Sequence, residues 1–303
     1  MFVARPPGGS APRHHLPLVG AQRRVFTGSA QFLADPANRA RVAEYLTDMA
    51  RPYAIEVPAE LAGKELGHSY GEMAEPLISA LVPPDEPVDL LVLAFSVHDL
   101  RPGRQTAAYL SHVTPGSPMA FAICDQGSAA AFTGLRIARE YSASAGVRRT
   151  LLIVVEQAAL PYDCPGPVPS QNQGVAMLYG ECQNPLALVT EVCQHPGVPP
   201  DRAAELAAKE SARLMAGHSQ ARMVLADSLA AAWPTYADWP VRVVPAGQPM
   251  TGVWWGIIDE LGASYHGAKA DDRTLLVAAD YDPGLRYLCL TAFEKEPAEW
   301  ETA

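Results

Sequence analysis

The chain has 303 residues, 49% of them hydrophobic, and a formal net charge of −10. A chain of this size and composition can bury one large core or two fused ones. The acidic charge argues against nucleic acids and anionic membranes as partners, because both bind through basic surfaces. We therefore expect a globular protein that binds neither.

The five cysteines are scattered and form neither a CxxC pair nor the spacing of a zinc site. An odd, scattered set is typical of reduced thiols in the cytoplasm. The N-terminus has no charged start followed by an apolar segment, and no apolar run approaches the ~18 residues of a membrane helix. We expect a cytoplasmic protein with no metal and, lacking a phosphate-binding glycine loop, no nucleotide cofactor.

The first third of the chain alternates between helical and strand patterns. Residues 1–20, rich in Pro, Gly and His, are predicted to be a flexible lead-in. Periodicity then separates five elements before residue 111. In order, these are a strand at 25–33, helices at 38–49 and 66–81 (the second interrupted by Pro76), a buried strand at 88–95 and a helix at 105–110.

A small-residue turn, 125–131, stands at the centre of the sequence. The apolar run 119–124 before it has the length of a strand, and the residues after it recur at helical spacing. A β-branched run at 151–155 then predicts a buried strand. Ser128 therefore lies where a strand meets the first turn of a buried helix, and unpaired N–H groups gather there. A hydroxyl in this place could be a nucleophile whose oxyanion those groups stabilise.

Ser128 also has a purely structural interpretation. Serine is a preferred N-cap, and small residues at such a turn let a helix and a sheet approach closely. The spacing alone does not choose between a capping serine and a nucleophilic one.

The rest of the chain continues the alternation. A Pro-rich segment at 158–173 predicts a connector or pocket loop. Alternating helices and apolar strands predict a layered α/β fold. The later elements are strands at 174–180 and 186–193, an Ala-rich helical region at 200–232, a short strand at 241–244, and a hairpin with strands at 274–279 and 285–293 around the turn at 282–284.

The central segment resembles the nucleophile segment of the thiolase-fold ketosynthases, the ketoacyl synthase III and chalcone synthase group. Leu135 and Ala138 match that family's L-x-x-A helix, and Gln126-Gly127-Ser128 is similar to its Gln-Gly-Cys. The resemblance places Ser128 where the family has its catalytic cysteine. The unit at 66–95, a helix followed by an acidic loop and a strand, is also similar.

The C-terminal part extends this resemblance. The run 247–261, GQPMTGVWWGIIDEL, has the register of the family's Gly-Asn helix start, which places Gln248 at the catalytic Asn. The family's His lies about thirty residues earlier, where this chain has His218. The resemblance implies a catalytic set of Ser128, His218 and Gln248. In the family, however, a strand runs directly into the His, whereas 201–217 is predicted to be helical; His218 as a polar helix residue and Gln248 as a loop residue stay open.

The resemblance also implies the architecture. We expect a thiolase-like αβαβα fold of two related halves, at 21–170 and 171–303, with the second half shortened. The fold implies a homodimer, or a heterodimer with another ketosynthase. Acyl-CoA or an acyl carrier protein would be the partner in acyl transfer. Local arginines could dock an acidic carrier, with solvated surface charge as the alternative; the candidates are Arg101, Arg104, Arg136, Arg139, Arg148 and Arg149.

Two functions follow from the resemblance. In the first, the chain is an acyltransferase in polyketide or other secondary metabolism that accepts an acyl group on Ser128, with His218 as base, because a serine hydroxyl needs one. In the second, it is a catalytically silent subunit that pairs with an active, cysteine-bearing ketosynthase. A generic serine hydrolase is disfavoured because Ser128 lacks the Gly-x-Ser-x-Gly elbow.

Overall fold

The computed structural model describes residues 15–28, 30–57, 67–101, 103–144, 146–158, 167–235, 239–263 and 273–295. Ten strands form one mixed sheet in the order β3-β2-β4-β5-β1-β6-β10-β9-β7-β8. The strands are β1 (Leu16–Phe26), β2 (Leu90–Ala94), β3 (Met119–Ile123), β4 (Arg149–Glu156), β5 (Asn172–Gly180), β6 (Ala187–His195), β7 (Gln220–Leu225), β8 (Val241–Val243), β9 (Thr274–Asp282) and β10 (Tyr287–Lys295).

Seven α-helices and two short 3-10 helices accompany the sheet in the described part of the chain. The 3-10 helices are η1 (Gln31–Ala34) and η2 (Arg51–Tyr53). The α-helices are α1 (Pro36–Ala50), α2 (Tyr70–Leu81), α3 (Thr106–Val113), α4 (Ala129–Ser144), α5 (Pro200–Met215), α6 (Asp227–Ala232) and α7 (Gly252–Gly262).

The sheet consists of two halves with the same strand order. Across the sheet, the strands of the first half follow in the order β3-β2-β4-β5-β1. Counted inward from the opposite edge, the second half has the equivalent order β8-β7-β9-β10-β6, so that β6 lies beside β1 at the centre. In this repeat β4 corresponds to β9, and the helix α4, which follows β3, corresponds to α7, which follows β8. Strand β5 pairs with β4 and β1 inside the first of these repeats, so by strand order the two repeats meet between Gly180 and Ala187. The division of the chain at 170/171 stays a prediction.

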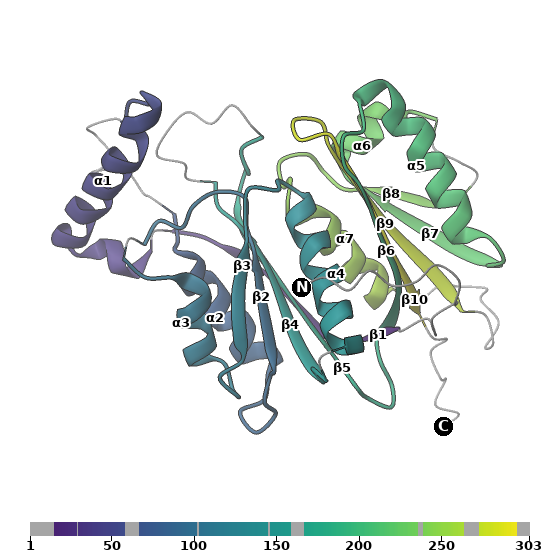
Figure 1. The fold of residues 1–303 in the computed structure, drawn as a ribbon, viewed down its shortest axis with the longest axis horizontal. Coiled ribbons are helices and arrows are strands. Elements are labelled where there is room, and N and C mark those ends of the chain that lie inside the picture. Colours follow the sequence, from purple (N-terminus) through teal and green to yellow (C-terminus); the bar gives the residue numbers. More distant parts are fainter. Residues whose placement is uncertain are drawn as a thin grey trace.

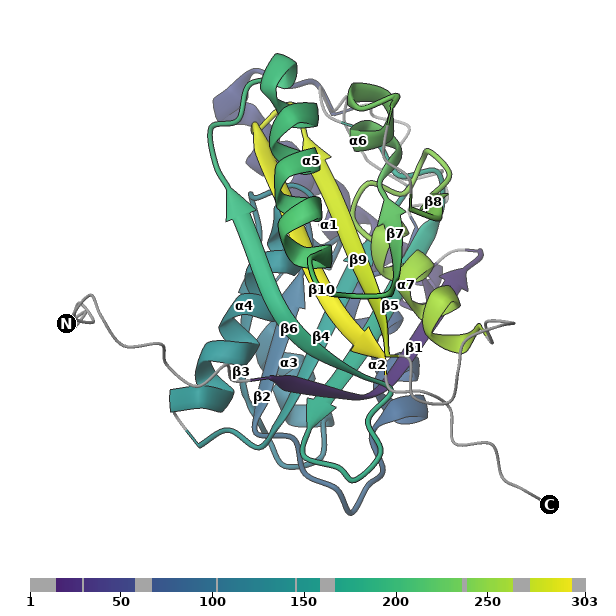
Figure 2. The same ribbon diagram turned by 90° about the vertical axis from the view of Figure 1, so that its right-hand side faces the viewer.

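Three layers of helices enclose the two half-sheets (Figure 1). Helices α2 and α3 cover the outer face of the first half, and α5 and α6 cover that of the second. Figure 2 shows α5 lying over β9, β10 and β6. Helix α4 contacts strands of both halves and shares the central core with α7, where the Phe132 and Trp254 rings lie 4.8 Å apart. The order of layers is αβαβα, as predicted.

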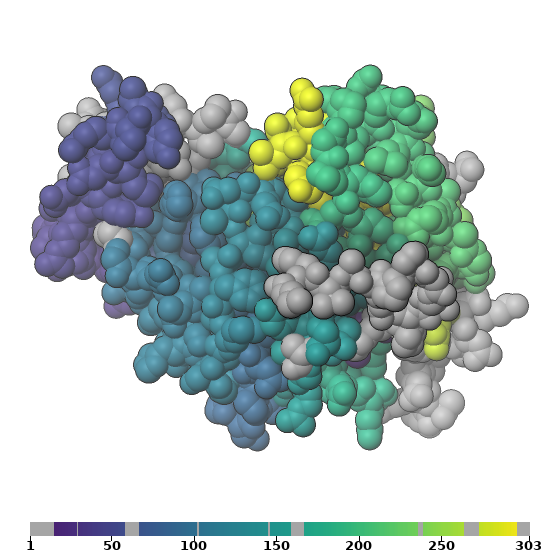
Figure 3. Space-filling model, in the orientation of Figure 1, coloured from purple at the N-terminus to yellow at the C-terminus, as the bar shows by residue number. Residues whose placement is uncertain are grey.

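Strands β2, β4, β5 and β9 carry apolar residues on both faces, as the continuous apolar runs predict. On β2, Leu90 and Val92 join the central core, whereas Leu91 and Leu93 pack under α2 and α3. Helix α1 stands apart from these layers and projects from the molecule (Figure 3). Its apolar residues Val42 and Leu46 form a small separate cluster with Leu33 and Leu100.

Most predicted elements are confirmed within a few residues, but three differ. The first strand is β1 (Leu16–Phe26), which shares only Val25 and Phe26 with the strand predicted at 25–33; residues 31–34 form η1 instead. Residues 16–20 are therefore strand and not a flexible lead-in, and residues 1–14 lie outside the described part. Helix α2 runs through Pro76 without interruption. The region 200–232 is not helical throughout, because the strand β7 separates α5 from α6.

Leu135→Ala in α4 is expected to lower the free energy of unfolding by about 2–5 kcal/mol, because Leu135 is fully buried between the halves and alanine leaves a cavity. Alanine is a good helix former, so helix propensity does not add to the loss. Urea unfolding followed by circular dichroism measures the change.

Leu186→Ala is the matched control. Leu186 is 44% exposed, so this substitution should change stability by no more than about 0.5 kcal/mol. Equal losses in both variants would contradict the placement of α4 in a core shared by the two half-sheets.

Candidate functional site

Ser128 lies between the end of β3 and the first turn of α4, as predicted, and is 8% exposed. The turn is tight: Gly127 has φ +51°, and a Cβ there would meet the Asp282 carboxylate at 1.9 Å. Glycine is therefore required next to Ser128. The N–H groups of Ala129 and Ala130 bond to the carbonyls of Gln126 and Gly127, at 3.1 and 3.2 Å.

Asp280 on β9 is the side chain that meets Ser128. It is 3% exposed, hydrogen-bonds to the Ser128 hydroxyl, and accepts a bond from Ser228 Oγ at 3.4 Å. Its pKa is raised to about 7, chiefly by burial; the bond from Ser128 opposes this rise, and the negative charges of Asp282 and Asp227 add to it. Near neutral pH this carboxyl group can both accept and release a proton, as a general base must.

A small cavity of about 70 Å³ lies against Ser128. One water molecule takes up about 30 Å³ in the liquid, so the cavity has room for about two. Its walls combine both halves of the protein. Besides Ser128 they include Tyr70, Ser96, Val97, Gly127, Glu156, Gln157, Pro167, Pro169, Pro249, Met250 and Asp282.

Glu156, at the end of β4, lines the Ser128 cavity and contacts the start of α7. Its carboxylate accepts bonds from the N–H groups of Met250 (2.9 Å) and Thr251 (3.0 Å), from the Thr251 hydroxyl, and from Gln248 Nε2 (2.8 Å). Burial raises its pKa to about 6 despite these donors. With so many bonds to the segment before α7, Glu156 is a structural anchor for that segment.

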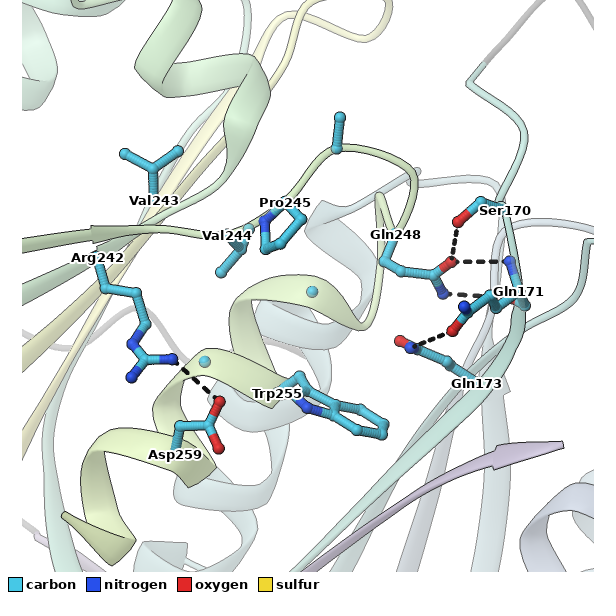
Figure 4. A pocket seen from close by; sticks show the side chains of 13 residues that line it. Ser170, Gln171, Gln173, Arg242, Val243, Val244, Pro245, Gln248, Trp255 and Asp259 are labelled. Atoms are coloured by element: carbon cyan, nitrogen blue, oxygen red, sulfur yellow. Dashed lines mark hydrogen bonds and ion pairs between the residues drawn. The ribbon is translucent and has the colours of Figure 1, made fainter.

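Gln248 is not among the residues that line the Ser128 cavity. Its Oε1 accepts bonds from Ser170 Oγ (3.1 Å) and the Gln171 N–H (3.0 Å), as Figure 4 shows. Its Nε2 bonds to Glu156, so Gln248 reaches the Ser128 cavity only through that carboxylate. It lines a second, larger cavity of about 320 Å³ instead.

His218 is not brought to Ser128. It precedes β7, and its Nε2 lies 3.9 Å from Glu294. Gln220 pairs with Thr274 at the start of β9, whereas Asp280 lies six residues further along that strand. At about 3.3 Å per residue, the two ends of β9 are ~20 Å apart. The segment that β7 runs into is Ala226–Ser228, which supplies Ser228 to the site.

The structure thus does not bring the three residues of the predicted set together. Ser128 lies in the cavity wall, Gln248 lies behind Glu156, and His218 lies at the other end of the sheet. No histidine is among the described residues that line the Ser128 cavity. Asp280 and Ser228 were missed. The sequence held a signal for both residues. Asp280 directly follows the apolar run 275–279, and Ser228 comes shortly after the apolar run 223–226, in a region predicted to be helical.

Within the described ranges, no group of three His, Cys, Asp or Glu side chains could hold a metal ion. No helix in the described part is both long and apolar enough to cross a membrane.

Asp280 should make folding stability depend on pH. Its pKa is raised from 3.8 to about 7, so the folded chain holds this proton more tightly than the unfolded chain. The resulting stabilisation is complete below about pH 3.8 and is lost as the pH rises to 7. Glu156 acts in the same direction between 4.5 and about 6. Between pH 5 and pH 8 we expect the free energy of unfolding to fall by roughly 2–3 kcal/mol from Asp280 alone, at about 1.4 kcal/mol per pKa unit.

Asp280→Asn should remove most of this fall, as urea unfolding at the two pH values can measure. Asp85→Asn, at an exposed position, is the control and should keep the wild-type pH dependence. The same fall in the Asp280→Asn protein would show that another group causes it.

No protein-family model matches the sequence, and no curated protein matches it. Solved structures do match over nearly the whole chain. AbyA1, a tetronic acid condensing enzyme, is 17% identical with a TM-score of 0.61, over 92% of this chain and 99% of its own. ChlB3, an acyltransferase, is 16% identical with a TM-score of 0.60, over 95% and 100%.

A third match is 3-oxoacyl-[acyl-carrier-protein] synthase III from Aquifex aeolicus, 13% identical with a TM-score of 0.59, over 92% of this chain and 99% of that one. At such low identity the matches establish the architecture. The chain has the thiolase-like fold of the ketosynthase III enzymes.

Proposed function

We propose that the chain is an acyltransferase of ketosynthase III type that takes an acyl group from a CoA or acyl-carrier-protein thioester onto Ser128 and passes it to an acceptor. The observation that carries this proposal is the Ser128 hydroxyl bonded to Asp280, a carboxyl with a pKa of about 7, at the wall of a cavity. The names of two matching structures, a condensing enzyme and an acyltransferase, agree with acyl chemistry. A role in polyketide or other secondary metabolism, and a cytoplasmic location, stay predictions.

In the proposed reaction Asp280 replaces the histidine base. The Ser128 oxygen attacks the thioester carbonyl carbon while Asp280 takes the hydroxyl proton. The C–S bond then breaks, and the proton on Asp280 passes to the departing sulfur, which leaves as a thiol. The product is an acyl ester on Ser128, which an acceptor nucleophile resolves. This reaction needs no metal or redox cofactor.

The start of α4 would stabilise the oxyanion. The N–H groups of Ala129 and Ala130 are occupied by carbonyls of the preceding turn. The Ser128 N–H, with the positive end of the α4 dipole, is then the donor nearest the reacting carbonyl. An acyl oxoester is less activated than a thioester, so acyl transfer fits Ser128 better than carbon–carbon condensation. Arg136, exposed on α4, is a candidate contact for an acidic carrier.

Incubation with a panel of acyl-CoA and acyl-carrier thioesters should add one acyl group, which intact-protein mass spectrometry detects. Ser128→Ala should abolish the adduct. Asp280→Asn should slow its formation by about 10²–10⁴-fold, the usual contribution of a positioned base. The acylation rate of the wild type should rise with pH and level off above about 7, as Asp280 ionises.

Two variants serve as controls. Ser96→Ala alters another hydroxyl residue of the same cavity and should keep the adduct. His218→Ala tests the catalytic set implied by the family resemblance, and it should also keep the adduct because His218 lies at the far end of the sheet. Loss of the adduct in His218→Ala, with Asp280→Asn unaffected, would favour that set over the Ser128–Asp280 pair.

Two observations favour a second function, that of a catalytically silent partner subunit. The described lining of the Ser128 cavity contains no histidine. In addition, β3 is the edge of the sheet and bears apolar residues, with Met119 49% exposed and Ala122 exposed. An unpaired apolar edge strand is a template for pairing with another chain. We propose that this edge pairs with a second copy, or with a cysteine-bearing ketosynthase in the silent alternative.

Ala122→Lys should prevent pairing at this edge, because a charged side chain would be buried against the partner strand. Light scattering after gel filtration should show a dimer for the wild type and a monomer for the variant. Val113→Lys, on the nearby helix α3, should remain dimeric. A monomeric wild type that carries no acyl adduct but captures a cysteine-bearing ketosynthase would favour the silent subunit.

A further inference from the structure

The larger cavity, about 320 Å³, lies beside α7 and is a separate site from the Ser128 cavity. We call it the α7 cavity. Figure 4 shows Trp255 and Asp259 of α7 at its base, Arg242 at one end, and Gln171, Gln173 and Gln248 at the other. Its remaining walls are Ser170, Val243, Val244, Pro245, Ala246, Gly252 and Gly256. The volume falls in the range of small-molecule sites.

The loop that closes the α7 cavity is fixed in place. The Ser170 N–H bonds to the Gly247 carbonyl at 2.7 Å, and Gln248 bonds to Ser170 and Gln171. Gly247 has φ +99°, and a Cβ there would meet Ser170 Oγ at 2.7 Å, so only glycine allows this approach. The cavity is preformed, and a ligand need not order it.

The protein's own hydrogen bonds already use part of the acceptor capacity of the cavity. Gln248 Oε1 accepts two bonds, and Gln171 Oε1 accepts one from Gln173. Asp259 pairs with Arg23 at 2.5 Å and with Arg242 at 3.1 Å.

Donors remain at both ends of the cavity. Gln171 Nε2 has no hydrogen-bond partner among the described residues, and Gln173 Nε2 uses only one of its two N–H groups. Arg242 bonds to Glu260 and Asp259 through Nε and Nη1, which leaves Nη2. A ligand that supplies oxygen acceptors would therefore find donors at both ends of the cavity, whereas the Asp259 carboxylate, which would attract a cationic ligand, is already paired with two guanidinium groups.

We propose that the α7 cavity binds a small molecule whose carbonyl or carboxylate oxygens accept bonds from Gln171, Gln173 or Arg242. Its apolar body packs against the Trp255 ring and the side chains of Val244 and Pro245. Binding at this site does not depend on acyl transfer at Ser128.

The α7 cavity is also connected to the Ser128 cavity. Gln248 lines the α7 cavity and donates to Glu156, and Glu156 lines the Ser128 cavity. A ligand that shifts Gln248 therefore changes the bonds that hold Glu156. Where Ser128 acylation occurs, saturating ligand should change its rate, and this part alone rests on the proposed function.

Three matched probes test the class of ligand. Phenylacetate carries carboxylate acceptors, phenylacetamide a neutral carbonyl, and phenethylamine donors without a carbonyl. Saturation-transfer NMR and titration calorimetry should detect one or both of the first two, and the pair distinguishes charged from neutral acceptors. Phenethylamine should not bind. Binding of phenethylamine alone, or of none of the three, would overturn the proposal.

Two variants locate the site. Pro245→Trp, in the wall of the cavity, should take up part of its volume and reduce probe affinity at least tenfold, whereas Val113→Trp, on α3 and outside the cavity, should not. Gln171→Glu replaces a donor by an acceptor, so it should weaken phenylacetate and allow phenethylamine to bind. Gln105→Glu, exposed and outside the cavity, is its control. Unchanged affinities in Pro245→Trp and Gln171→Glu would place the probes elsewhere and overturn the assignment.

Discussion

The carboxylate of Glu156 joins the two halves of the protein where the sites meet. It ends a strand of the first half-sheet and accepts bonds from the segment that begins α7 in the second. A buried carboxylate is costly unless several donors compensate it. Here two backbone N–H groups, a hydroxyl and a carboxamide do so, and they fix the positions of Gln248 and Met250. The wall between the two cavities depends on this one group.

Ser128 is buried in a turn whose neighbouring carboxyl groups determine how its hydroxyl can react. Asp282 accepts bonds from the N–H groups of Gly284 and Leu285 and stands against Gly127, so the β9–β10 turn and the turn before α4 support each other. Asp280, two residues earlier, has no such backbone donors besides that of Tyr281 and shares two serine hydroxyls instead. Burial, the main cause of the raised pKa of Asp280, lets this carboxyl group keep its proton to a higher pH. The neighbouring acids of one strand thus have different roles.

The architecture could be predicted because it is encoded in local patterns. Apolar runs of strand length at 88–95 and 151–155, the helix after Ser128 and the final hairpin are repeated signals that agree with one another. The site could be predicted only in part. Ser128 follows from its own segment, whereas Asp280 reaches it from 152 residues away through strand pairing that no local pattern records. The assignment of His218 relied on sequence spacing. The six-residue strand β7, which lies between Ala-rich helices, was not predicted, and it carries the chain from His218 to the opposite end of the sheet.

The repeat within the sheet places two buried acids at equivalent positions of the two halves. Strand β4 corresponds to β9, and α4 corresponds to α7, so each half offers an acid near the end of a central strand to the first turn of the other half's buried helix. Glu156 meets the start of α7, and Asp280 meets the start of α4. Glu156 is saturated by four donors and works as a structural anchor. Asp280 is bonded by two hydroxyls, one of them on the helix turn, and can exchange its proton. Two equivalent acid–helix contacts have therefore diverged into one fixed contact that joins the halves and one exchangeable contact at the candidate reactive serine.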